Sequence, residues 1–169
     1  MTKTGVVDAE GATAGLFKRV AGHWATGVSV TTTIDAAGTP HGLTMSAVSS
    51  LSLNPAQFLI CIDAGSETLV PLSESGLFCI NILGAEQVHV SRAFASRVPD
   101  RFAGIGWRRL ACGLPVLDGV IAYAACRVSA VLPGGDHRIL IGDLLEGGTP
   151  GGEPLLHFRG GYRASQPLT

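Results

Sequence analysis

Residues 42–55 read GLTMSAVSSLSLNP, a stretch without a charged side chain. Its hydroxyl residues, among them Thr44 and Ser46, lie between aliphatic residues without the strict alternation of a strand buried on one face. Small hydroxyl groups leave room for close approach to the backbone and offer donors without the desolvation cost of charge. The stretch predicts a flat wall for a large, partly polar ligand. The alternative is an ordinary serine-rich strand that ends in a turn at Asn54-Pro55.

The sequence on both sides of this stretch predicts antiparallel strands. Residues 28–34 form a β-branched run, and the turn at 35–38 returns the chain into the serine-rich stretch as a hairpin. Residues 58–62 (FLICI) and 77–83 (LFCINIL) are continuous apolar runs, which are typical of fully buried strands. A second hairpin is expected further along, with arms at 122–132 and 139–145, and a last strand at 154–158.

Three short helices are expected among these strands. Residues 13–23 place Leu16, Phe17 and Val20 on one helical face. Residues 66–75 follow a strand, with Ser66 as the expected N-cap, and residues 87–95 have a helical pattern.

Because strands follow strands through short turns, the pattern favours a mainly β protein, an antiparallel barrel closed on itself with a few short helices. Residues 1–12 are expected to be a flexible N-terminal tail. Residues 13–169 are expected to form a single domain, since the chain is long enough for one sizeable core.

The composition limits the classes of partner. Hydrophobic residues make up 46% of the chain and charged residues 15%, yet no apolar run approaches the roughly 18 residues of a membrane span. We therefore expect no membrane partner, and a ligand pocket and a subunit interface are the natural places for the surplus apolar surface. The net charge is −1 and no basic stripe occurs, so no nucleic-acid partner is expected.

The four cysteines, Cys61, Cys79, Cys112 and Cys126, form no CxxC pair and lack zinc spacing, so no metal site is expected. All of them are expected to be buried and free. The N-terminal residues have no pattern of a secretion signal. A reducing cytoplasm is therefore the expected compartment.

Three polar groups are candidates for chemistry. Asp136 and His137 lie at the expected hairpin tip, where the acid could orient an imidazole that titrates near neutrality, or where both could simply face solvent. His157 and Arg159 precede two glycines and could meet a phosphate, or could end a strand. Residues 66–68 could bind an anion at a helix start or form an ordinary cap.

Taken together, these segments resemble the flavin reductase family, the small reductase component of two-component flavin monooxygenases. The resemblance covers about residues 14–163. The matching segments occur in the family's order: FKRVAGHWATGVSVTT, GLTMSAVSSLSLNP, LICID, SET, FCINIL, QVHVSRAFA, FAGIGW, GLPVLDG, GGDH, IGD and PLLHFRGGY.

The resemblance implies a Greek-key-like, FMN-binding split β-barrel that works as a homodimer. It implies reduction of FMN or FAD by NADH or NADPH, with the reduced flavin passing to a separate monooxygenase. Contacts with the flavin are expected from Pro40, Gly42, Leu43, Thr44, Met45, Ser46, Ala47, Ser50, Cys61, Ile62, Asp63, Ser66, Glu67, Thr68 and Arg92. Contacts with the nicotinamide nucleotide are expected from His137, His157, Phe158, Arg159, Gly160 and Tyr162, and His137 is the expected catalytic residue, positioning the nicotinamide.

The chain departs from the family pattern at Glu67, where members often carry Arg or Lys, and Arg92 is the cation expected to take over the phosphate. The absence of a basic cluster for a 2′-phosphate favours NADH.

Two alternatives to this function stay open. One is a split-barrel protein with tightly held FMN that acts on another redox substrate. The other is a flavin-binding module without turnover.

Overall fold

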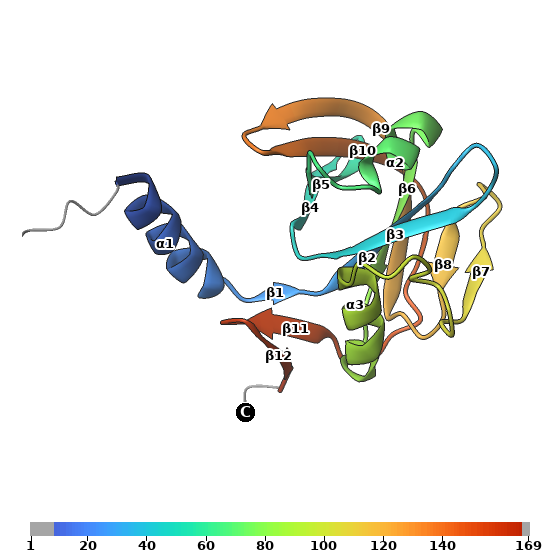
Figure 1. The fold of residues 1–169 in the computed structure, drawn as a ribbon. Coiled ribbons are helices and arrows are strands. Elements are labelled where there is room, and N and C mark those ends of the chain that lie inside the picture. Colours follow the sequence, from blue (N-terminus) through green and yellow to red (C-terminus); the bar gives the residue numbers. More distant parts are fainter. Residues whose placement is uncertain (1–8, 167–169) are drawn as a thin grey trace, which may run out of the picture.

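The computed structural model describes residues 9–166, and residues 1–8 of the expected tail lie outside this range. One curved antiparallel sheet dominates these residues (Figure 1). Its spatial order is β3-β2-β6-β9-β10-β5-β4. The strands are β2 (Ser29–Ile34), β3 (Pro40–Met45), β4 (Val48–Leu53), β5 (Ala56–Asp63), β6 (Leu77–Ile82), β9 (Ala122–Gly134) and β10 (His137–Gly148).

Two small sheets and four helical segments complete the described part. The first sheet joins β1 (Thr26–Gly27), β11 (Leu155–Phe158) and β12 (Gly161–Ala164), and the second joins β7 (Trp107–Arg109) and β8 (Pro115–Leu117). The helices are α1 (Ala9–Gly22), α2 (Leu69–Ser75), the 3-10 turn η1 (Ala85–Gln87) and α3 (Val88–Ala95). The predicted mainly β, antiparallel fold with a few short helices is confirmed.

The two edge strands of the large sheet, β3 and β4, are consecutive in the chain, with only Ser46 and Ala47 between them. The Cα atoms of Met45 and Val48 can therefore lie at most about 11 Å apart, so the sheet must curl until its edges approach. Within residues 9–166, however, β3 pairs with β2 and β4 with β5, and neither edge strand pairs with the other.

The sheet is thus a split barrel, as the resemblance implies, and the expectation of a barrel closed by hydrogen bonds is wrong. The physical reason lies in the bend at Ser46 and Ala47. The N–H of Cys61 donates to the carbonyl of Ala47 at 3.0 Å, so pairing with β5 begins at the bend itself and β4 turns away from β3.

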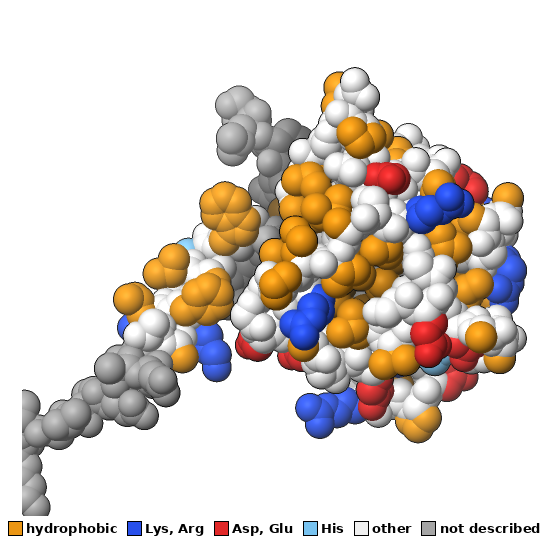
Figure 2. Space-filling model, turned by 90° about the horizontal axis from the view of Figure 1, so that it is seen from above, with side chains coloured by type: hydrophobic (Ala, Val, Ile, Leu, Met, Phe, Trp, Pro, Cys, Tyr) orange, Lys and Arg blue, Asp and Glu red, His pale blue; other side chains and the backbone are white. Residues whose placement is uncertain are grey.

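Helix α1 stands apart from the sheets at the N-terminal side of the molecule (Figures 1 and 2). It begins at Ala9, four residues before the expected start at Thr13. Its apolar face is not buried in this chain, because Phe17 is 71% and Val20 65% exposed. Trp24, just beyond the helix, is 78% exposed.

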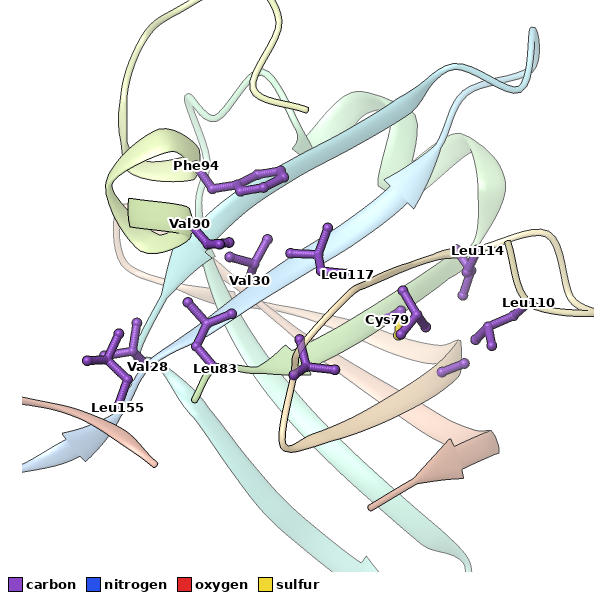
Figure 3. Close-up of a cluster of buried hydrophobic side chains, with 13 residues drawn as sticks. Val28, Val30, Cys79, Leu83, Val90, Phe94, Leu110, Leu114, Leu117 and Leu155 are labelled. Carbon is purple, nitrogen blue, oxygen red and sulfur yellow. The ribbon is translucent and has the colours of Figure 1, made fainter. Parts of the chain in front are cut away.

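Two hydrophobic clusters form the core. In the first, Val90 and Phe94 of α3 point toward Val30 of β2 (Figure 3). The second gathers around Phe78, with Ile60 and other residues of the opposite sheet half. Burial in β6 is nearly continuous, as predicted, whereas in β5 it alternates.

Several local expectations need correction. Thr68, not Ser66, is the N-cap of α2, since the helix begins only at Leu69. The strand β11 is not the last one, because the chain turns at Arg159 and Gly160, both with positive φ, into β12. Strands β7 and β8 were not predicted, as their apolar runs are very short.

The expectation that all cysteines are buried is wrong for Cys61 and Cys112, which are partly exposed. Cys61 belongs to β5, where only alternate side chains face the core. Among residues 9–166, no helix is both long and apolar enough to cross a membrane.

Candidate functional site

The centre of the candidate site is the exposed bend of Ser46 and Ala47 in the gap between β3 and β4. Ser46 borders three cavities, with volumes of about 650, 290 and 200 Å³. Thr44 lies on β3, two residues before Ser46, and is half-buried. Its hydroxyl donates to the carbonyl of Ser91 at 2.7 Å. The hydroxyl-rich segment is therefore exposed to solvent at Ser46, while the hydrogen bond of Thr44 anchors it to α3.

The cavity of about 650 Å³, which we call the serine cavity, brings together residues from distant parts of the sequence. Ser46 and Ala47 meet Cys61 of β5 and His157 of β11 along its wall. Apolar groups supply most of the remaining wall, including Phe17 of α1, Trp24 and Leu59. His157 reaches this position because β11 pairs with β1, where Thr26 is its register partner.

The cavity of about 200 Å³, which we call the tyrosine cavity, lies beside it and is lined by His157 and Tyr162 of the C-terminal hairpin. Tyr162 of β12 shares a hydrogen bond of 2.9 Å with the hydroxyl of Ser91 on α3. The rings of His157 and Tyr162 meet edge to face, with centroids 6.0 Å apart. Arg92 lies over the Tyr162 ring at 5.9 Å, so the cation expected at the phosphate is directed toward this hairpin.

A fourth cavity, of about 720 Å³, which we call the arginine cavity, lies at the other end of β3. Its wall contains four residues expected at the flavin, Pro40, Gly42, Glu67 and Thr68. Arg101 also lines it, from a loop that sequence reasoning left aside. The family often has Arg or Lys at the position of Glu67, so the absence of a cation there was the signal that could have prompted a search for another arginine.

Arg101 is held in place by backbone acceptors. Its Nε donates to the carbonyl of Ser96 and its Nη1 to the carbonyl of Gly42, both at 2.9 Å. Its Nη2 lies 3.8 Å from a carboxylate oxygen of Glu67. The charge of Glu67 is thus partly balanced by a guanidinium 34 positions further along the chain.

His137 is placed at the tip of the β9–β10 hairpin, where its Nδ1 lies 2.7 Å from Asp136 Oδ1. This hydrogen bond, with the nearby imidazole, lowers the pKa of Asp136 below its usual value. In the ladder with β5, His137 is the partner of Asp63, and Ile139 is the partner of Cys61. His137 therefore shares the sheet face of Cys61, about 7 Å further along the strand, but the serine cavity is lined by His157 and not by His137.

Most of the other expected flavin contacts lie outside these cavities, although Met45 borders the tyrosine cavity. The side chains of Met45 and Ile62 are 8% and 1% exposed and pack in the second core cluster, so either residue could meet a ligand mainly through its backbone. Leu43 packs against the same cluster, and Ser50 is exposed on β4. Ser66 is partly buried, and its hydroxyl accepts the N–H of Thr68 at 3.4 Å.

Gly42 has a structural reason for being glycine. A Cβ at this position would lie 2.8 Å from Cε1 of Phe94, so α3 could not pack as closely on β3.

The expected nicotinamide contacts Phe158, Arg159 and Gly160 form the end of β11 and its turn. This turn is tied to α1, because the N–H of Arg159 donates to the carbonyl of Gly22 at 2.8 Å.

The described residues contain no group of three or more His, Cys, Asp or Glu side chains that could hold a metal ion. The potential donors at the serine cavity are hydroxyl and backbone groups, one imidazole, one thiol and the ammonium group of Lys18 on α1. Mostly uncharged donors beside an apolar wall suit a flat, mostly neutral ring system, and flavin fits that description.

Comparisons with known proteins agree with this arrangement. A family model described as flavin reductase like domain matches residues 21–166. The reductase subunit HsaB of a flavin-dependent monooxygenase from Rhodococcus jostii is 38% identical over 168 residues, which cover 99% of this chain and 86% of that protein.

Solved structures show the same likeness. The nitrilotriacetate monooxygenase component B homolog from Mycobacterium thermoresistibile is 39% identical with a TM-score of 0.90, covering 94% of this chain and 90% of that one. An NADH:FAD oxidoreductase from Streptomyces globisporus, in complex with NAD and FAD fragments, is 29% identical with a TM-score of 0.87, covering 96% and 97%. With its split barrel, its open hydroxyl bend and these relatives, the chain belongs to the flavin reductase like family.

Proposed function

We propose that this protein uses NADH or NADPH to reduce FMN or FAD and releases the reduced flavin to a separate monooxygenase. The observation that carries the proposal is the exposed bend of Ser46 and Ala47, which faces His157 across one apolar cavity. Two relatives carry names of monooxygenase components, and a third is named an NADH:FAD oxidoreductase. NADH is the preferred donor in this proposal, because the sequence has no basic cluster that could bind the 2′-phosphate of NADPH.

The chain's own residues would bind and orient rather than exchange protons. A bound flavin would accept the hydride, so the protein needs no catalytic triad. Ser46 and the backbone beside it would hold the ring edge, and His157 would face the incoming nicotinamide. Phe17, Trp24 and Leu59 would exclude water from the stacked rings.

A spectrophotometric assay tests the proposal. The protein is mixed with NADH and, separately, riboflavin, FMN or FAD, and loss of the nicotinamide absorbance is followed. We expect steady oxidation that depends on added flavin. Flavin that stays on a yellow protein through turnover would favour the alternative of tightly held FMN, and flavin binding without NADH oxidation would favour the non-catalytic module.

For His137, we propose a positioning role toward the nicotinamide. Replacing His137 with alanine is expected to raise KM for NADH about tenfold and to change kcat less than about threefold, because a group that contributes only to binding affects KM. Steady-state kinetics with saturating flavin measure both values. His89→Ala, an exposed histidine on α3, is the matched control. A collapse of kcat at unchanged KM would refute the role.

The homodimer is part of the proposal, and the exposed apolar face of α1 supports it. Leu16, Phe17, Val20 and Trp24 are each more than half exposed, and a second copy of the chain would remove them from water. Phe17→Glu is expected to weaken self-association at least about tenfold, because a carboxylate in an apolar contact must be desolvated. Light scattering over a dilution series measures the change.

Leu53→Glu serves as the control for the dimer, because Leu53 is an equally apolar but 91% exposed residue at the β4–β5 turn. Its dissociation constant should stay within about twofold of the unmodified protein's. A monomeric unmodified protein at assay concentration would contradict the dimer.

A further inference from the structure

We propose that Ser91 of α3 is a positioning residue, which acts through Tyr162 to orient His157 toward the nicotinamide nucleotide. The inference rests on the proposed flavin reduction and adds a residue that the sequence analysis did not single out. Ser91 lines the tyrosine cavity together with Tyr162 and His157, and its side chain is 0% exposed. A hydroxyl that is buried this completely needs a hydrogen-bond partner, and the choice of partner carries the argument.

The hydroxyl of Ser91 has its partner outside the helix. A serine within a helix commonly bonds to the carbonyl four residues before it. Here the partner is instead the hydroxyl of Tyr162 on β12, at 2.9 Å. Val90 and Phe94 of the same helix are buried in the first core cluster and fix α3 on β2 (Figure 3). Ser91 therefore presents its hydroxyl to Tyr162 from a rigid base.

The C-terminal hairpin needs such a tie, because β12 is an edge strand. Within the described residues it pairs with β11 alone. Two side-chain hydrogen bonds connect residues 161–166 with more distant parts of the described chain. One joins Ser165 to the carboxylate of Glu153 at the surface, and the other is the half-buried bond of Tyr162 to Ser91. The second bond is the one that fixes the hairpin beside the cavities.

Tyr162 passes this position on to His157. The two residues are register partners in the β11–β12 ladder, and their rings meet edge to face with centroids 6.0 Å apart. In the part of the chain that the structure describes, the imidazole of His157 makes no hydrogen bond of its own. Its orientation therefore depends on packing, and the ring of Tyr162 is its aromatic neighbour in the cavity wall.

A second group of Ser91 holds the opposite wall. Its backbone carbonyl accepts the hydroxyl of Thr44 at 2.7 Å, on the strand that leads to the Ser46 bend. The carbonyl thus anchors the wall proposed for the flavin, and the hydroxyl anchors the hairpin proposed for the nicotinamide. Substitution with alanine removes the hydroxyl and keeps the carbonyl, so the two effects can be separated.

Ser91→Ala is expected to raise KM for NADH about fivefold, the factor that one net hydrogen bond gives. The value of kcat and the dissociation constant for flavin should stay within about twofold, because the bond of Thr44 is retained and only binding of the nucleotide is weakened. Steady-state kinetics with saturating FMN and flavin fluorescence measure the three values.

Ser75→Ala is the matched control. The hydroxyl of Ser75 on α2 shares a hydrogen bond of the same 2.9 Å length with Thr33 on β2, outside the lining of the serine and tyrosine cavities. Its loss should leave KM for NADH within about twofold of the unmodified protein's.

Tyr162→Phe removes the same bond from the other side and completes a double-mutant cycle. It is also expected to raise KM for NADH about fivefold. The double variant should show the same fivefold effect, because both substitutions remove one interaction, whereas independent roles would multiply to about 25-fold.

Proton NMR of the histidine ring gives a readout that does not depend on activity. The signal of His157 is identified by its loss in His157→Gln. Because the Tyr162 ring influences this signal through its orientation, we expect the signal to shift in Ser91→Ala and in Tyr162→Phe and to stay in place in Ser75→Ala.

An unchanged KM for NADH in Ser91→Ala would overturn the inference, as would multiplying effects in the double variant or an equal rise of KM in Ser75→Ala. Should Ser91→Ala not fold, Tyr162→Phe tests the same bond from its half-buried end. Failure of the proposed function has a different signature, namely that the unmodified protein oxidises no NADH with any flavin. The NMR signal of His157 would then still show whether Ser91 orients it.

Discussion

Replacing Ser46 with tryptophan is expected to lower kcat/KM for flavin reduction by about a hundredfold or more while the protein stays folded. Ser46 is exposed at the bend and borders the cavities of about 650, 290 and 200 Å³. An indole would occupy the space proposed for the flavin ring, and even small misplacement of reacting groups can cost about a hundredfold in rate. NADH oxidation with saturating FMN or FAD measures the loss.

The control for this prediction is Ser129→Trp, since Ser129 is an exposed serine on β9 outside the cavities that Ser46 borders. It should retain activity within about twofold. Circular dichroism and Tm should show both variants folded, because exposed substitutions rarely change stability by more than about 0.5 kcal/mol. A fully active Ser46→Trp enzyme would place the flavin elsewhere and refute the site.

Phe78→Ala is expected to have the largest effect on stability, about 3–5 kcal/mol of the free energy of unfolding. The Phe78 side chain is 0% exposed and lies in the second core cluster. Gly142 on β10 packs directly against the Phe78 ring, since a Cβ at this position would lie 2.5 Å from Cζ of Phe78. Truncation would leave a cavity between β6 and β10. Urea unfolding at one fixed protein concentration measures the change.

Two further substitutions bracket this value. Phe78→Leu keeps most of the buried volume and should cost clearly less than the alanine variant. Leu53→Ala, at a side chain that is 91% exposed, should stay within about 0.5 kcal/mol. A loss below about 1 kcal/mol for Phe78→Ala would show that the core around this ring can collapse to fill the space.

Much of the succession of strands and turns along the chain was predictable because its signals are local. The β-branched run of β2 and the turn at 35–38 indicate the first hairpin, and the β9–β10 hairpin follows from its glycine-rich tip. The run at 87–95 indicates the helix that the structure divides into η1 and α3. In each case the deciding interactions lie within a few residues of one another.

Other features were not predictable because they depend on partners far away in the sequence. The apolar face of α1 indicates burial, yet the chain itself leaves it exposed. Arg101 has no local signal, because its role follows from a bond to the carbonyl of Gly42, 59 positions away. The assignment of Arg92 to the phosphate stays a prediction, and its position over the ring of Tyr162 does not support it.

By itself, the sequence determined the antiparallel strands, their turns, the hydroxyl stretch at 42–55 and, through ordered motifs, the family. Only the tertiary structure decided that the barrel stays split, that Ser46 stands open in the gap, and that His157 and Arg101 reach opposite ends of β3. The reason is physical: turns and strands follow from neighbouring residues. The meeting of two sheet edges follows from how the whole curved sheet packs around its two cores.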